Sequence, residues 1–138
     1  MTEVKLKTTL KAPPGKVWDI IGDFNGLPRF VAAVTKSDVE GSGVGSVRTL
    51  SLAGGGEIRE RLEAFDQGGK TLKYSIVDGP LPVKDYLSTV SLSPTEKGGT
   101  EVSWSSTFEP FGVGEAEARQ AIEGVYRLGF DGLHKLFG

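Results

Sequence analysis

Residues 47–65 read VRTLSLAGGGEIRERLEAF, and this stretch decides the fold class. Each half contains a mostly apolar series of alternate residues, namely Arg48-Leu50-Leu52 and Ile58-Glu60-Leu62-Ala64. Successive side chains of a strand point to opposite faces of a sheet, so each series shares one face. The glycines at 54–56 supply a reversal between the halves. We therefore expect the two halves to pair as antiparallel strands.

Two later segments continue this alternation and place more polar groups on the predicted inner face. Their series are Leu72-Tyr74-Ile76 and Tyr86-Ser88-Val90-Leu92. Charged groups on an otherwise apolar face are costly unless they pair with one another or face a cavity. The sequence therefore predicts a hollow, mostly apolar interior that holds a small polar cluster of Arg48, Glu60, Tyr74 and Tyr86.

Turn residues divide the middle of the chain into short strands. They cluster at 41–45, 53–56, 66–69, 78–83 and 94–99. Before them, residues 4–10 alternate apolar side chains with lysines, which indicates a half-exposed strand. Because these turns leave no room for crossover helices, residues 34–110 are predicted to form an antiparallel meander.

Helices are predicted on either side of the meander. Pro13-Pro14 opens a first helix that ends at Gly22-Asp23, and a second short helix is expected around Leu27–Ala33. After Pro110, apolar residues recur at three- and four-residue steps, which predicts an amphipathic helix of about six turns. Its apolar stripe consists of Ala118, Ala121, Ile122, Val125, Leu128, Leu133, Leu136 and Phe137.

Three glycines interrupt the long helix, at positions 124, 129 and 132. Each costs about 1 kcal/mol of stability relative to alanine. They either let the helix approach the sheet closely, leave space beside it, or are tolerated on a well-packed helix.

Together the elements predict an α+β helix-grip fold. In this single domain, residues 1–138, a curved antiparallel sheet of about seven strands surrounds the long helix.

Composition argues against several function classes. The 138 residues include 25% charged side chains and carry a net charge of −2, unlike the basic footprint of a nucleic-acid binder. No apolar run approaches the roughly 20 residues that span a bilayer. The N-terminus lacks a signal-peptide core, so a cytoplasmic location is expected. Cysteine is absent and His134 is the only histidine, so we expect neither a metal nor a cofactor.

Several strings along the chain resemble the START-like (SRPBCC) superfamily in its polyketide cyclase/dehydrase branch. The strings cover residues 17–24, 43–48, 60–66 and 72–76, and the long closing helix follows them. Within the superfamily, the chain is similar to lachrymatory factor synthases at Arg48, Glu60, Tyr74 and Tyr86. It looks more distantly like the abscisic acid receptors, but Gly54-Gly55-Gly56 replaces their gate sequence. The resemblance implies a ligand cavity, catalytic roles for the arginine and the glutamate, and a mobile glycine lid.

The predicted inner residues point to proton-transfer chemistry. Burial raises the pKa of a carboxyl and a neighbouring guanidinium lowers it, so Glu60 next to Arg48 can be poised as a general acid or base. Catalytic roles are predicted for Glu60, Arg48 and Tyr86. The residues expected to contact the ligand are Tyr74, Ser88, Trp104, Leu50, Leu62 and Ile76. The alternative for the charged residues is a buried structural ion pair.

Two functions suit this interior. The first is cyclase, dehydratase or isomerase chemistry on a small hydrophobic or enolisable molecule, without a cofactor. The second is non-catalytic carriage or sensing of a hydrophobic ligand, in which Arg48 anchors a carboxylate. An accessory protein that acts through its surface is a third reading, with less support in the sequence.

Overall fold

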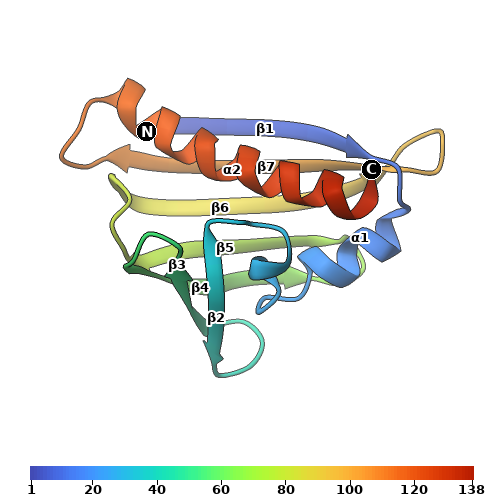
Figure 1. The fold of residues 1–138 in the computed structure, drawn as a ribbon, viewed down its shortest axis with the longest axis horizontal. Helices are drawn as coiled ribbons and strands as arrows, with labels where there is room; N and C mark the ends of the chain where they lie inside the picture. Colours follow the sequence, from blue (N-terminus) through green and yellow to red (C-terminus); the bar gives the residue numbers. More distant parts are fainter.

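The computed structural model describes residues 1–138 and shows a seven-stranded antiparallel sheet with one long helix across it (Figure 1). The strands are β1 (Thr2–Leu10), β2 (Val34–Glu40), β3 (Val47–Leu52), β4 (Glu57–Asp66), β5 (Thr71–Asp78), β6 (Val83–Pro94) and β7 (Thr100–Pro110). The helices are α1 (Pro14–Ile21), the 3-10 helix η1 (Leu27–Arg29) and α2 (Glu115–Phe137). The predicted α+β helix-grip arrangement is confirmed.

The sheet follows the predicted meander from β2 to β7, and β1 then pairs with the outer side of β7. Its register is irregular at one place in β2, between Val34 and Lys36, at two places in β4, and at one in β6, between Lys84 and Leu87. Such bulges bend a strand and increase its twist. The sheet accordingly curves, with β2, β3 and β4 turning away from the plane of β1, β7 and β6 in Figure 1.

The buried face of α2 differs from the predicted stripe. Its buried residues are Ala118, Ile122, Tyr126, Gly129, Phe130 and Leu133. Leu128 and Leu136, which were predicted to be buried, are 42% and 49% exposed. The helix instead turns Tyr126 and Phe130 toward Trp104 of β7, and the rings of Trp104 and Tyr126 stack with centroids 4.3 Å apart. None of the helices is both long enough and apolar enough to cross a membrane.

Two of the three glycines in α2 lie at close approaches. A Cβ atom on Gly129 would lie 2.5 Å from Cζ3 of Trp104, and one on Gly132 would overlap the carbonyl oxygen of Phe30. A Cβ atom on Gly124 would meet nothing within 4 Å. Close approach therefore explains Gly129 and Gly132, whereas space is open beside Gly124.

The second short helix is shorter than predicted. Only Leu27–Arg29 forms a turn, of the 3-10 type, and the prediction that the helix continues to Ala33 is wrong. The amide groups of Phe30 and Val31 both donate to the carbonyl of Leu27, after which the chain turns toward β2. Hydrogen-bond geometry is poorer in 3-10 helices, so they usually stay short. The segment places Leu27, Phe30 and Val31 against the core.

Candidate functional site

Arg48 and Glu60 form a buried ion pair on the inner face of the sheet. They are directly opposite each other on β3 and β4, so the strand register alone brings them together. Nε of Arg48 donates to Oε1 of Glu60 at 2.8 Å, and Nη2 lies 2.7 Å from the same oxygen. The two residues are only 4% and 6% exposed, so water screens the pair little.

The Arg48 guanidinium is held between aromatic rings. Its Cζ atom lies 4.1 Å from the ring centroid of Phe24 and 4.9 Å from that of Tyr74. Nη1 donates to the carbonyl oxygen of Phe24 at 2.9 Å. A cation over an aromatic face is attracted by the ring quadrupole. The guanidinium is therefore fixed in position by contacts from three sides.

Glu60 is paired through one of its two carboxylate oxygens. Oε1 accepts the hydrogen bond from Nε of Arg48 and forms the ion pair with Nη2, and Oε2 makes no hydrogen bond. Burial raises the pKa of Glu60 above its ordinary value, and the attraction of Arg48 opposes this rise without cancelling it. A buried carboxyl with a raised pKa and a free oxygen can accept or give up a proton at that oxygen.

A second, neutral polar cluster lies next to the ion pair, on β5, β6, β7 and α2. Nε1 of Trp104 donates to the Tyr74 hydroxyl and to Oγ of Ser88, both at 3.1 Å. The Ser88 hydroxyl donates to the carbonyl of Ser105 at 2.9 Å and lies 3.1 Å from the hydroxyl of Tyr126. Ser88 of β6 therefore links Trp104 of β7 to Tyr126 of the long helix.

The bond that the Ser88 hydroxyl donates decides which hydroxyl is the donor in the Ser88–Tyr126 and Tyr126–Tyr86 hydrogen bonds. Because its hydrogen is donated to the Ser105 carbonyl, its oxygen accepts from Tyr126. Tyr126 then accepts from the hydroxyl of Tyr86, which lies 2.6 Å away. Burial raises the pKa of Tyr74, Tyr86 and Tyr126 above the ordinary phenol value. These phenols consequently remain protonated at neutral pH, and Tyr86 and Tyr126 act as hydrogen-bond donors.

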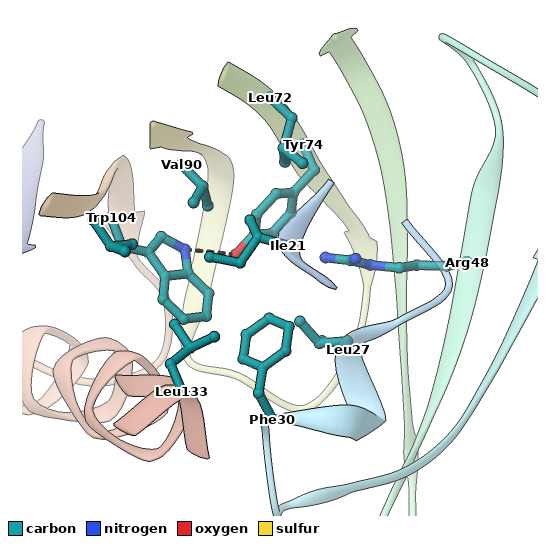
Figure 2. A pocket seen from close by; sticks show the side chains of 10 residues that line it. Ile21, Leu27, Phe30, Arg48, Leu72, Tyr74, Val90, Trp104 and Leu133 are labelled. Atoms are coloured by element: carbon teal, nitrogen blue, oxygen red, sulfur yellow. Dashed lines mark hydrogen bonds between the residues drawn. The ribbon is translucent and has the colours of Figure 1, made fainter. Parts of the chain in front are cut away.

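Two small cavities lie beside the ion pair. The first, called here the Arg48 chamber, has a volume of about 20 Å³, and Figure 2 shows Arg48 pointing toward it from β3. The second, the Glu60 chamber, has a volume of about 60 Å³. Fifteen of the sixteen residues that line the Glu60 chamber are hydrophobic, and Glu60 is the exception. Leu27, Tyr74 and Trp104 line both chambers.

The chambers are small for a ligand site. Typical small-molecule pockets measure about 300–1,000 Å³, and an apolar cavity of about 150 Å³ accommodates benzene. At about 60 Å³, the larger chamber has room for only a few atoms. The interior thus contains two small voids in place of the open cavity that the sequence predicts, and a ligand has to displace side chains to enter it. No three His, Cys, Asp or Glu side chains come together in the structure.

Most of the predicted site residues come together in this interior. Those that line the Glu60 chamber are Glu60, Tyr74, Tyr86, Trp104, Leu50 and Ile76. Arg48 lines the other chamber. Leu62 is buried but lines neither chamber, and Ser88 takes part through its hydrogen bonds only.

Sequence reasoning missed Phe24, Leu27 and Tyr126. Tyr126 carried a usable signal, because it lies four residues after Ile122 and four before Phe130 on one face of the helix. Phe24 contacts Arg48 through its backbone carbonyl and its ring, from a loop whose path has no sequence signature. Leu27 reaches both chambers from the short 3-10 helix.

Several solved structures resemble this one closely. XoxI of Bacillus cereus is 35% identical and superimposes with a TM-score of 0.93, covering 99% of this chain and 96% of that chain. A Bacillus thuringiensis protein is 34% identical with a TM-score of 0.92, covering 99% and 98%. A Nitrosospira multiformis protein is 24% identical with a TM-score of 0.86, covering 99% and 97%, and shows the shared fold alone.

Sequence comparisons point to one family. "MLP-like protein 423" of Arabidopsis thaliana is 28% identical over an alignment of 115 positions, which covers 75% of this chain and 74% of that protein. The whole chain, residues 1–138, matches the sequence profile described as polyketide cyclase/dehydrase and lipid transport. The chain therefore belongs to the polyketide cyclase/dehydrase and lipid transport family, and this membership implies that it binds a hydrophobic ligand.

Proposed function

We propose that the interior binds a small, mostly apolar molecule with one acidic or enolisable group, and that Glu60 moves a proton on it. The observation that carries this proposal is the free Oε2 of Glu60, on a buried carboxyl that is the one charged group lining an apolar chamber. Burial raises the pKa of Glu60, which brings the carboxyl closer to the range in which it can both take and return a proton.

Arg48 has the complementary role of stabilising negative charge. Its contacts with Glu60 and Phe24 fix the guanidinium and leave it with further N–H groups, since a guanidinium carries more donors than these bonds use. Arg48 lines the smaller chamber, where such an N–H group can donate to a ligand oxygen that becomes an anion. Tyr74, whose ring lies against the guanidinium and lines both chambers, orients the ligand.

Carriage of a hydrophobic ligand without turnover is the second candidate. It is favoured by the contacts of Arg48, which is held by a carboxylate, a carbonyl and two rings as a structural ion pair would be. It is also favoured by the neutral cluster, in which Tyr86 and Tyr126 donate to neighbouring protein groups. In this case Arg48 anchors an acidic head group and Glu60 holds Arg48 in place.

Glu60→Gln separates the two candidates, because glutamine has a similar shape but cannot act as a base. Native mass spectrometry of protein purified from its own host first identifies the bound molecule, which then serves in turnover and binding assays. We expect the substitution to lower turnover by about 100-fold or more, with affinity changed by only about twofold to threefold. Glu57→Gln, on the exposed end of the same strand, is the matched control and should change neither turnover nor affinity. Full turnover in Glu60→Gln would exclude the proton-transfer role.

A further inference from the structure

Trp104 forms the wall between the two chambers. It lines both of them, together with Leu27 and Tyr74, and is the largest of the three side chains. Figure 2 shows its indole between Val90 and Leu133, with its nitrogen facing the Tyr74 hydroxyl. A ligand that extends from the Glu60 chamber into the Arg48 chamber must therefore pass between Trp104, Leu27 and Tyr74.

The indole is held firmly in place on both its polar edge and its face. Its N–H group is shared between Tyr74 and Ser88 at 3.1 Å each. Its ring stacks on Tyr126 at an interplanar angle of 18°. Leu27, by contrast, sits on a single turn of 3-10 helix. Leu27 is thus the lining residue that a ligand can displace, whereas Trp104 keeps its position.

Gly129 provides the space that the indole occupies. The backbone of α2 passes so close to Trp104 that a Cβ atom at position 129 would lie 2.5 Å from Cζ3, closer than real Cβ atoms approach. An alanine there forces the indole or the helix to move. Gly124 lies on the same helix with no atom within 4 Å of its Cβ position, so alanine is accommodated there. The two glycines form a matched pair for experiment.

We infer that Trp104, seated against Gly129, is the specificity-determining residue of this interior and limits the ligand body to about the size of a single ring. The inference rests on the proposed binding of an apolar molecule between these walls. With all side chains in place, neither chamber offers the roughly 150 Å³ that accommodates benzene, so a single ring enters only when Leu27, which lines both chambers, is displaced, and the fixed indole then leaves no room for a second ring. A smaller residue at position 104 joins the chambers and extends the range to two-ring molecules.

Trp104→Leu tests the size limit with benzene, indole and naphthalene as probes. Their dissociation constants are measured by NMR titration of wild-type protein and variant, and a crystal structure of the variant shows the cavity. We expect one continuous cavity and a gain in affinity of about tenfold or more for indole and naphthalene, with a smaller gain for benzene. Equal affinities in the two proteins, or two chambers still separate in the variant, would overturn the inference.

Gly129→Ala tests the seating of Trp104 without enlarging the interior. Displacement of the indole breaks its bonds to Tyr74 and Ser88, so its N–H hydrogen should exchange with solvent about tenfold faster or more. Gly124→Ala should leave that exchange unchanged. Equal exchange in both variants would also overturn the inference. These readouts use no natural substrate, so they can succeed even when Glu60→Gln shows that the proposed proton transfer is wrong.

Discussion

The two polar clusters of the interior differ in charge and in the arrangement of their hydrogen bonds. In the charged cluster, Oε2 of Glu60 has no hydrogen bond. In the neutral cluster, Tyr86 donates to Tyr126, which donates to Ser88, which donates to a backbone carbonyl. A carboxylate oxygen with free accepting capacity can bind a ligand donor, whereas a chain of hydroxyls that donate to one another mainly rigidifies its surroundings. The charged pair is thus suited to act on a ligand, and the neutral cluster to hold the wall around it.

The largest expected effect is that of breaking the ion pair from one side. Arg48→Ala leaves the Glu60 carboxyl buried without its partner and should lower the free energy of unfolding by about 3–5 kcal/mol. The double variant Arg48→Met/Glu60→Leu removes both charges, so its free energy of unfolding should fall much less than that of Arg48→Ala. Urea denaturation measures both. For comparison, Arg59→Ala removes the exposed pair with Asp78 and should cost at most about 1 kcal/mol. A similar cost for Arg48→Ala would mean that the buried pair behaves like a surface pair.

Removal of one hydroxyl from the neutral cluster should have a smaller, purely structural effect. Tyr126→Phe deprives Tyr86 of its acceptor and Ser88 of a donor, and should lower the free energy of unfolding by about 1–3 kcal/mol. Affinity for the co-purified ligand should stay within about threefold of the wild-type value, because the bonds lost are internal to the protein. A large loss of affinity at unchanged stability would show that the ligand itself contacts this hydroxyl.

The two clusters should also differ in their dependence on pH. Burial raises the pKa of Glu60 above its ordinary value of 4.5, so the folded state binds the proton more tightly than the unfolded state. The stabilisation from this proton is complete below the ordinary value and is lost as the pH rises through the folded-state pKa. Wild-type protein should therefore lose stability relative to Glu60→Gln as the pH increases above 4.5.

Denaturation curves of both proteins at several pH values measure this difference, which is the smallest of the three effects. The phenols should add no pH dependence in the same range, because their ordinary pKa is about 10 and burial raises it further. The difference in free energy of unfolding between Tyr126→Phe and the wild type should accordingly stay constant up to about pH 9. If the free energies of unfolding of Glu60→Gln and the wild type also differed by a constant amount over this pH range, the pKa of Glu60 would not be raised.

Sequence alternation was sufficient to predict the charged cluster but not the shape of the space around it. Arg48 and Glu60 follow a period of two on strands joined by a glycine turn, so their meeting depends on strand register alone. Tyr126 depends on the rotation of α2, and the mixed glycine and aromatic content of that helix left its buried face ambiguous. The chamber volumes depend on how Trp104 packs against Gly129, a contact between residues on two separate elements that a local pattern cannot encode.

The most direct test of a functional role for the Arg48–Glu60 pair is a crystal structure of the protein with the molecule that co-purifies from its own host. We expect the ligand to lie in the Glu60 chamber, with Leu27 displaced and a polar atom within hydrogen-bonding distance of Oε2 of Glu60. A ligand bound on the outer surface, or one bound inside with Oε2 still unpaired, would contradict this role. The pair would then be a structural element of the fold, and the site would have to be sought elsewhere.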